Sequence, residues 1–362
     1  MSKKIASLVL SLIIMGTSLV GCGNNTISKE NVTATTESTQ QESSEEVQNE
    51  ATEPQVRTVV DQLGRTVELP AEINRIVSSY YISSSLLIAL GAEDRVVGLE
   101  MKADTREVYK KAAPEFLELP GVGTSKSISV EETLALNPDL VIIPYRLEEF
   151  VEQFEALDIP VIVIEPESMD QFLECITLIG TAIGAEEKAD ALLNYYNEKM
   201  DQIAQLTAEV QERPRVYMSG GSSAFTTCTA NMYQNDLIKL AGGQNVSEEL
   251  TDGYWANVSA EQILAWDPEF IFNVNYASYD ISELTGDAQL GTVAAIKENR
   301  TYTFPSVLEA WDYPTPSSVL GILWLTQTLH PELYSVEEYI KDAQDFYQTF
   351  YDIEITQEDM GL

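Results

Sequence analysis

The stretch that decides the fold is EEKADALLNYYNEKMDQIAQLTAEVQER, residues 186–213. It contains neither glycine nor proline, and Pro214 follows it directly. Its apolar side chains recur at steps of mostly three and four residues, which predicts an amphipathic helix. A helix of this length spans roughly 40 Å, about the width of a small domain. We therefore predict one long helix over residues 186–213 that bridges two lobes.

The segments on either side of this stretch share an element order and a repeated phrase. Residues 129–139 read SVEETLALNPD and lead to LVII, whereas residues 259–269 read SAEQILAWDPE and lead to FIF. Short runs of Val and Ile alternate with helical stretches, which is typical of parallel sheets covered on both faces. We predict an α/β fold of two lobes, residues 56–185 and 214–362, with central, mostly parallel sheets flanked by helices. The alternative is that residues 186–213 form a surface helix inside one large domain and do not bridge two lobes.

The first residues predict a lipoprotein signal. Lys3 and Lys4 precede an apolar run, residues 5–20, that is too short to span a membrane comfortably. The run ends on Leu19-Val20-Gly21-Cys22, which resembles the bacterial lipobox. That resemblance implies a signal peptide of residues 1–21 and acylation of Cys22, and hence attachment to a membrane outside the cytoplasm, at the cell surface or in a periplasm. A plain signal peptide with an incidental cysteine is the alternative.

Composition limits the partners that the protein can have. Residues 22–55 are rich in Ser, Thr, Asn, Gln and Glu, and they predict a disordered acidic tether. The formal charge is −37, and residues 1–55 supply only seven acids against three lysines, so the remaining residues carry about −33. Such a charge repels phosphates, which excludes a nucleic-acid role.

Cysteine and histidine are too scarce for most catalytic sites. Besides Cys22, the sequence has Cys175 and Cys228, which we predict to be free, buried thiols. The only histidine, His330, follows a predicted helix over residues 317–329, and we assign it to the helix terminus and not to ligand binding. A single histidine argues against Ser–His or Cys–His catalysis and against a catalytic zinc site. No phosphate-loop or dinucleotide-binding motif occurs. We predict a protein that is not an enzyme, with no intrinsic cofactor and no metal site.

Three stretches together carry a family resemblance. RIVSSYYISSSLLIALGAEDRVVGL (residues 75–99), LPGVGTSKSISVEETLALNPDLVII (residues 119–143) and the long helix resemble the bacterial solute-binding proteins with a helical backbone. The resemblance runs from about Val56 to Tyr347 and rests on order and spacing. It implies a monomeric substrate-binding lipoprotein of an ABC importer that captures a ferric siderophore, corrinoid or haem between its lobes. Its partners would be a permease dimer and the associated ATPase.

Other ligands and functions stay open at this point. A small oxyanion such as molybdate is the alternative ligand. A secreted α/β enzyme, or a sensor or adhesin on the same fold, is the alternative function.

Candidate ligand-binding residues follow from the predicted strands. In parallel α/β sheets, ligands collect beyond the carboxyl ends of the strands. Aromatic rings there suit a large, partly apolar chelate, and Arg146 is able to clamp a carboxylate or catecholate. Packing roles are the alternative for each residue. This rule nominates Ser79, Tyr80, Tyr81, Glu100, Met101, Thr124, Ser125, Tyr145, Arg146, Ser222 and Tyr276, and the resemblance adds Trp255, Glu309, Trp311 and Tyr313.

Two glutamates occupy equivalent positions in the repeated phrase. Glu131 and Glu261 each stand third from the opening serine, where a first-turn carboxylate is favoured by the helix dipole. The resemblance implies a second role, in which one acidic residue on each lobe docks against arginines of the permease dimer.

Overall fold

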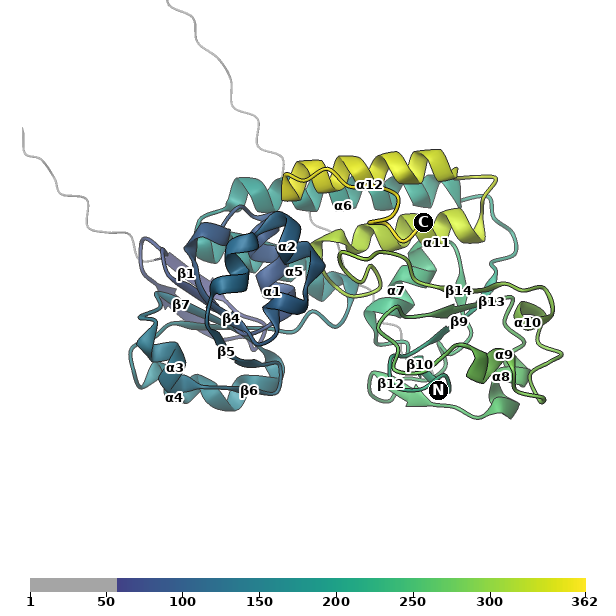
Figure 1. Ribbon diagram of the computed structural model, residues 1–362, viewed down its shortest axis with the longest axis horizontal. Helices are drawn as coiled ribbons and strands as arrows, with labels where there is room; N and C mark the ends of the chain where they lie inside the picture. Colours follow the sequence, from purple (N-terminus) through teal and green to yellow (C-terminus); the bar gives the residue numbers. More distant parts are fainter. Residues whose placement is uncertain (1–56) are drawn as a thin grey trace, which may run out of the picture. The chain divides into compact units, whose positions relative to one another are not determined.

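The computed structural model describes residues 57–362, which belong to one compact unit (Figure 1). The expected signal peptide, the acylated Cys22 and the tether lie outside the described residues. Within residues 57–362, no helix is both long and apolar enough to cross a membrane.

The first lobe begins with a β-hairpin and continues into a parallel sheet. Strands β1 (Arg57–Val60) and β2 (Thr66–Leu69) pair antiparallel. The six-stranded sheet has the order β6-β5-β4-β3-β7-β8, and only β6 runs antiparallel to its neighbour. Its strands are β3 (Ile76–Ser78), β4 (Val96–Glu100), β5 (Gly121–Thr124), β6 (Ser127–Ile128), β7 (Leu140–Pro144) and β8 (Val161–Ile164).

Helices cover both faces of this sheet, as the continuous apolar strands predict. Ile142 and Ile162 pack into one core cluster, whereas Val141 and Val163 pack into another on the opposite face. Figure 1 shows α1, α2 and α5 on one side of the sheet and α3 and α4 on the other. These helices are α1 (Tyr81–Ala89), α2 (Glu107–Ala112), α3 (Val130–Ala135), α4 (Val151–Glu155) and α5 (Met169–Ile183).

The second lobe has a mixed sheet. Strands follow the order β12-β10-β9-β13-β14, with β11 also paired to β9, and both β10 and β12 run antiparallel to their neighbours. The strands are β9 (Arg215–Ser219), β10 (Thr226–Cys228), β11 (Gln244–Asn245), β12 (Trp255–Asn257), β13 (Phe270–Asn273) and β14 (Thr301–Thr303). The helices are α7 (Tyr233–Leu240), α8 (Ala260–Trp266), α9 (Ser282–Thr285), α10 (Ala294–Lys297), α11 (Val319–Leu329) and α12 (Val336–Tyr351).

A long helix joins the lobes, which confirms the predicted two-lobed α/β fold. This helix, α6 (Glu186–Leu206), packs against α5 of the first lobe and against α7 and α11 of the second. It ends seven residues before the predicted boundary. The amide of Val210 donates a hydrogen bond to the carbonyl of Thr207 at 3.1 Å, which forms a tighter turn than an α-helix makes. Pro214 then disfavours the helical backbone conformation of the residue before it.

One buried tyrosine fixes α6 to the second lobe. Tyr196 is fully buried, and its Oη lies 3.1 and 3.0 Å from the carbonyl oxygens of Thr315 and Pro316. The same oxygen accepts a hydrogen bond of 3.1 Å from the amide of Val319. The long helix therefore holds the segment that precedes α11.

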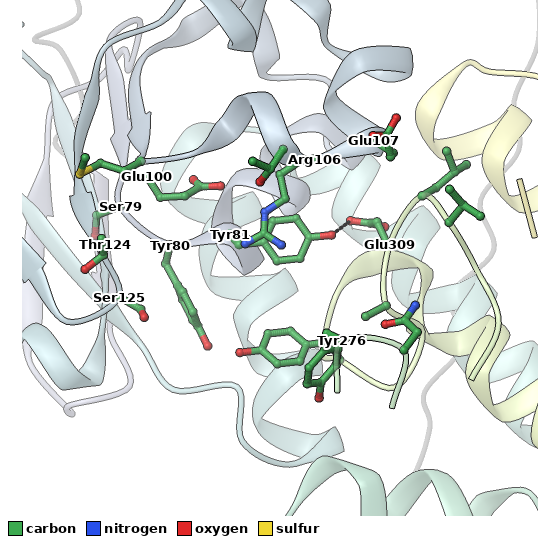
Figure 2. A pocket seen from close by; sticks show the side chains of 17 residues that line it. Ser79, Tyr80, Tyr81, Glu100, Arg106, Glu107, Thr124, Ser125, Tyr276 and Glu309 are labelled. Atoms are coloured by element: carbon green, nitrogen blue, oxygen red, sulfur yellow. Dashed lines mark hydrogen bonds between the residues drawn. The ribbon is translucent and has the colours of Figure 1, made fainter. Parts of the chain in front are cut away.

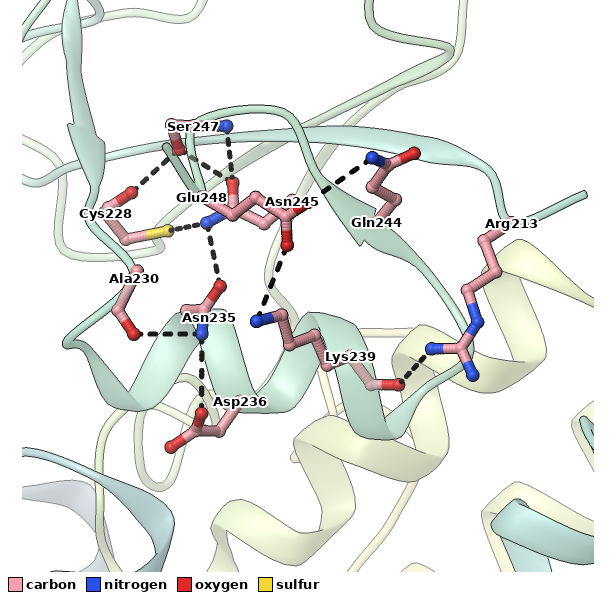
Figure 3. Close-up of polar contacts among 10 residues, drawn as sticks. All are labelled: Arg213, Cys228, Ala230, Asn235, Asp236, Lys239, Gln244, Asn245, Ser247 and Glu248. Atoms are coloured by element: carbon pink, nitrogen blue, oxygen red, sulfur yellow. Dashed lines mark hydrogen bonds and ion pairs between the residues drawn. The ribbon is translucent and has the colours of Figure 1, made fainter. Parts of the chain in front are cut away.

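The two thiols and the histidine are where the sequence predicts them. Cys175 and Cys228 are free and buried, and burial raises the pKa of Cys228 to about 12. Figure 3 shows Cys228 beside Asn245, whose amide nitrogen lies 3.7 Å from the sulfur and 3.2 Å from Oδ1 of Asn235. His330 is the residue that ends α11, and its Nε2 lies 3.3 Å from the carbonyl of Gly242. The contacts of Cys228 and His330 stabilise the second lobe, whereas Cys175 belongs to α5 of the first.

Candidate ligand-binding site

A cavity of about 500 Å³ is lined by residues of both lobes, and we call it the main cavity (Figure 2). The first lobe contributes the carboxyl ends of β3, β4 and β5, together with the loop after β4. The second lobe contributes the end of β13 and the loop before α11. The lining residues are Ser79, Tyr80, Tyr81, Glu100, Met101, Thr105, Arg106, Glu107, Thr124, Ser125, Asn275, Tyr276, Val307, Leu308, Glu309, Ala310 and Tyr313.

Arg106 supplies the positive charge of the main cavity. Its guanidinium carbon lies 3.9 Å from the centroid of the Tyr81 ring, and Figure 2 shows the two side chains stacked. Within residues 57–362, the guanidinium makes no hydrogen bond or ion pair, so its donors are available to a ligand. The sequence candidates did not include Arg106, and the only sequence signal for it was an arginine in the loop after Glu100 and Met101, which were candidates.

Glu309 connects the two lobes at the cavity wall. Its Oε1 accepts hydrogen bonds from Tyr81 Oη at 3.2 Å and Ser85 Oγ at 2.6 Å, both in α1. Its Oε2 accepts from Ser317 Oγ at 2.6 Å and from Tyr351 Oη at 2.8 Å. Burial raises the pKa of Glu309, and the four hydroxyl donors oppose that rise. The carboxyl group thus joins α1, the loop of the second lobe and α12.

Two further buried groups lie on the first-lobe side of the main cavity. Glu100 accepts hydrogen bonds from Ser84 Oγ at 2.7 Å and Tyr109 Oη at 2.9 Å, and burial raises its pKa. Ser79 Oγ is buried and has no hydrogen-bond partner among the described residues. An unpaired buried hydroxyl is costly, and a ligand atom in the cavity is able to relieve that cost.

A second cavity, which we call the side cavity, adjoins the main one. It encloses about 460 Å³, and Tyr80 and Ser125 line both cavities. Arg146 forms an ion pair with Glu167 at 3.2 Å, so the positive charge of Arg146 is already balanced by a carboxylate. Tyr254 of the second lobe donates a 3.2 Å hydrogen bond to Glu165 of the first. The lining residues are Tyr80, Ser125, Pro144, Tyr145, Arg146, Ile164, Glu165, Pro166, Glu167 and Tyr254.

The structure brings together many of the sequence candidates. The main cavity collects Tyr80, Tyr81, Thr124, Ser125, Tyr276, Glu309 and Tyr313, and the side cavity collects Tyr145 and Arg146. Glu165, Glu167 and Tyr254 were not among the candidates, although the two glutamates lie in the loop after β8.

Three candidates line neither cavity. Trp311 is fully buried and donates from Nε1 to Tyr347 Oη at 3.1 Å, so the prediction that it faces the cleft is wrong. Trp255 lies in β12 against Gly220, where an added Cβ would be 2.6 Å from the indole ring. Its neighbour Tyr254 lines the side cavity instead, because adjacent residues of an extended chain point to opposite sides. Ser222 is exposed in the loop after β9.

The paired glutamates lie on exposed helix starts. Glu131 and Glu261 are both exposed in the first turns of α3 and α8. The opening serines cap both helices, because Ser129 Oγ and Ser259 Oγ each accept a backbone hydrogen bond of 3.2 Å. Figure 1 shows α3 and α8 in different lobes, both on the side away from α6 and α12.

Comparison with known proteins agrees with this architecture. The periplasmic binding protein family matches residues 76–308. The chain belongs to this family. It is also 27% identical to the molybdate-binding protein MolA of Haemophilus influenzae, over 82% of this chain and 91% of that one. The vitamin B12-binding protein of Yersinia pseudotuberculosis is 26% identical over 60% of this chain and 76% of its own length.

Solved structures of other family members have the same fold. The crystal structure of a periplasmic solute-binding protein from Veillonella parvula has a TM-score of 0.73 and 26% identity, covering 85% of this chain and 97% of that one. MolA bound to molybdate also has a TM-score of 0.73, with 25% identity and coverage of 83% and 99%. The family comprises binding proteins, and its members named here differ in their ligands.

Proposed function

We propose that this protein is the substrate-binding component of an ABC importer and that it captures a neutral metal chelate, a ferric siderophore first of all, between its lobes. The observation that carries the proposal is the main cavity, which both lobes line and to which four tyrosines contribute. A volume of about 500 Å³ falls within the range of roughly 300–1,000 Å³ typical of small-molecule sites.

The charges around the two cavities favour a ligand without excess negative charge. Their lining includes two arginines, Arg106 and Arg146, against five glutamates: Glu100, Glu107, Glu165, Glu167 and Glu309. The whole chain carries −37. A ferric tris-catecholate bears three negative charges and would be repelled, whereas a ferric tris-hydroxamate is neutral because three monoanionic groups balance the ferric ion.

Two other ligand classes have support in the comparisons. A corrinoid is favoured by the similarity to the vitamin B12-binding protein, and the tyrosines would also stack on a corrinoid or haem. Molybdate is favoured by the similarity to MolA. Against molybdate, Arg106 is the only basic side chain of the described residues that lines the main cavity, and Glu107 and Glu309 line the same space. A small dianion requires more convergent donors than these.

The transport partners follow from the proposed role. An ABC permease dimer and its ATPase would receive the ligand, and acylation of Cys22 would hold a monomeric receptor on the outer surface of the membrane. Glu131 and Glu261 would dock one on each half of the permease. Their exposed positions at the starts of α3 and α8 support this assignment.

Isothermal titration with a ligand panel tests the proposal. The panel contains a ferric tris-hydroxamate, a ferric tris-catecholate, cyanocobalamin, haemin and molybdate. We expect one-to-one binding of the neutral ferric chelate and at least 100-fold weaker binding of the catecholate and of molybdate. Binding of molybdate alone would replace the chelate with an oxyanion as the cargo.

A further inference from the structure

The side cavity extends the ligand-binding space in one direction. It shares Tyr80 and Ser125 with the main cavity, so a ligand in the main cavity is able to send a substituent past the Tyr80 ring. Its walls come from the loops after β7 and β8 and, across the cleft, from Tyr254 of the second lobe. A space of about 460 Å³ is large enough to receive such an arm.

The charged groups of this cavity reject an anion. Arg146 is the only basic side chain among its lining residues, and its Nη2 lies 3.2 Å from Oε1 of Glu167. That ion pair leaves Glu165 as the uncompensated charge. Glu165 Oε1 accepts the hydroxyl of Tyr254 at 3.2 Å, and among the described residues its Oε2 accepts no hydrogen bond. A carboxylate placed here would meet two glutamates and an arginine that is already paired.

The aromatic lining favours a cation. Three tyrosines line the side cavity: Tyr80, Tyr145 and Tyr254. Tyr145 and Tyr254 are 40% and 37% exposed, so their rings are accessible to a ligand. Tyrosine ring faces attract an ammonium group through their quadrupole, and nearby carboxylates add charge-assisted hydrogen bonds. The tyrosine rings and the carboxylates therefore both favour an ammonium group.

We propose that the side cavity binds a protonated primary amine carried on a flexible arm of the chelate. This inference rests on the function proposed above and narrows the ligand class to a neutral metal chelate with a cationic arm. Glu165 and the tyrosine rings bind the ammonium group. The Arg146–Glu167 pair keeps the cavity from acquiring a net positive charge.

A matched pair of ligands tests this proposal on the full chain. One is a ferric tris-hydroxamate whose arm ends in a primary ammonium group, and the other is the same chelate with that nitrogen acetylated. Titration calorimetry should show about tenfold tighter binding of the ammonium form at low salt. In Glu165→Gln, the ratio of the two affinities should fall to about twofold, because the ammonium group loses its carboxylate partner. Glu149→Gln, an exposed carboxylate outside both cavities, serves as the control and should keep the tenfold ratio.

The outcomes separate the two proposals. Equal affinities of the wild-type protein for the two chelates would overturn the ammonium site and leave the chelate receptor standing. A tenfold ratio that persists unchanged in Glu165→Gln would also overturn the ammonium site, since Glu165 is the charge it requires. Binding of neither chelate would overturn both this inference and the proposed function.

Discussion

The hydroxyl of Tyr81, in the first lobe, lies 3.2 Å from Oε1 of Glu309, in the second, and both residues line the main cavity. Ser85 Oγ, also from the first lobe, reaches the same carboxylate oxygen at 2.6 Å. Contact between the lobes and the lining of the main cavity therefore use the same side chains. A ligand that displaces the Tyr81 hydroxyl would alter the connection between the lobes directly.

Glu309→Ala should destabilise the protein strongly. The substitution leaves the hydroxyls of Ser85, Ser317 and Tyr351 without their buried acceptor, and it also removes the partner of Tyr81. We expect a loss of about 3 kcal/mol in the free energy of unfolding, measured by urea titration. The control is Glu107→Ala, an exposed glutamate of the same cavity, which should change that free energy by about 0.5 kcal/mol or less. Equal effects of the two variants would show that the Glu309 hydrogen bonds contribute little.

Arg106→Gln should weaken ligand binding with little effect on stability. The guanidinium stacks on Tyr81 and has no other described partner, so its removal costs a ligand contact and one cation–π interaction. We expect about tenfold weaker binding of the ferric tris-hydroxamate by calorimetry and nearly the same melting temperature. Arg213→Gln, an exposed arginine that lines neither cavity, should bind normally. An unchanged affinity in Arg106→Gln would remove Arg106 from the site.

Asp312 should make stability depend on pH between about 4 and 6. It is fully buried, its Oδ2 accepts a 2.9 Å hydrogen bond from Tyr276, and its Oδ1 has no partner among residues 57–362. Burial raises its pKa from 3.8 to about 6. In this window the folded protein holds a proton that the unfolded chain has released, so the stabilisation present at pH 4 is lost as the pH rises to 6.

Asp312→Asn should remove that dependence. Relative to the wild type, the variant should gain on the order of 2 kcal/mol in unfolding free energy between pH 4 and pH 7. Urea titrations at several pH values measure the difference, and Asp252→Asn, at an exposed aspartate, is the control. A variant whose pH profile parallels that of the wild type would contradict the assignment.

Charge reversal at both Glu131 and Glu261 should abolish transporter stimulation. In proteoliposomes containing the importer, the double lysine variant should bind ligand normally but fail to stimulate ATP hydrolysis. Glu187→Lys combined with Glu337→Lys is the matched control, because these exposed glutamates also lie in first turns, those of α6 and α12. Full stimulation by the Glu131/Glu261 variant would rule out the docking role.

The elements that the sequence predicts well are those with a strong repeating pattern. β8, residues 161–164, is such a case, because a short run of buried Val and Ile between turns is typical of a strand in a parallel sheet. β10 and β12 went unpredicted, since each has three residues and depends on antiparallel pairing with a distant partner. The end of α6 was placed too late because periodic apolar residues continue into a turn. α12 was also missed, although Ser335 and Glu338 form a capping box that announces it.

The candidate site was predictable by location but not by side chain. Strand ends identified the loops with Tyr80, Tyr81 and Tyr276, because parallel strands bring their carboxyl ends to one edge. Which aromatic in a loop faces the cavity depends on local backbone direction. Trp311 and Tyr313 are two residues apart, yet one lies in the core and the other in the cavity wall. Arg106 depends on stacking against Tyr81, a contact that no local pattern encodes.

The segment that carries Val307, Glu309 and Tyr313 is held at both ends by distant parts of the chain. After this segment, the carbonyls of Thr315 and Pro316 are bound by the hydroxyl of Tyr196 in α6. Before it, the amides of Ser306 and Val307 donate hydrogen bonds to the carbonyls of Met360 and Asp359 at 2.7 and 2.9 Å. Asp359 also forms a 2.5 Å ion pair with Lys111 of the first lobe. Residues 356–362 thus support the part of the main-cavity lining that this segment provides. Deleting them, or fusing a purification tag beside them, would perturb ligand binding while leaving both sheets intact.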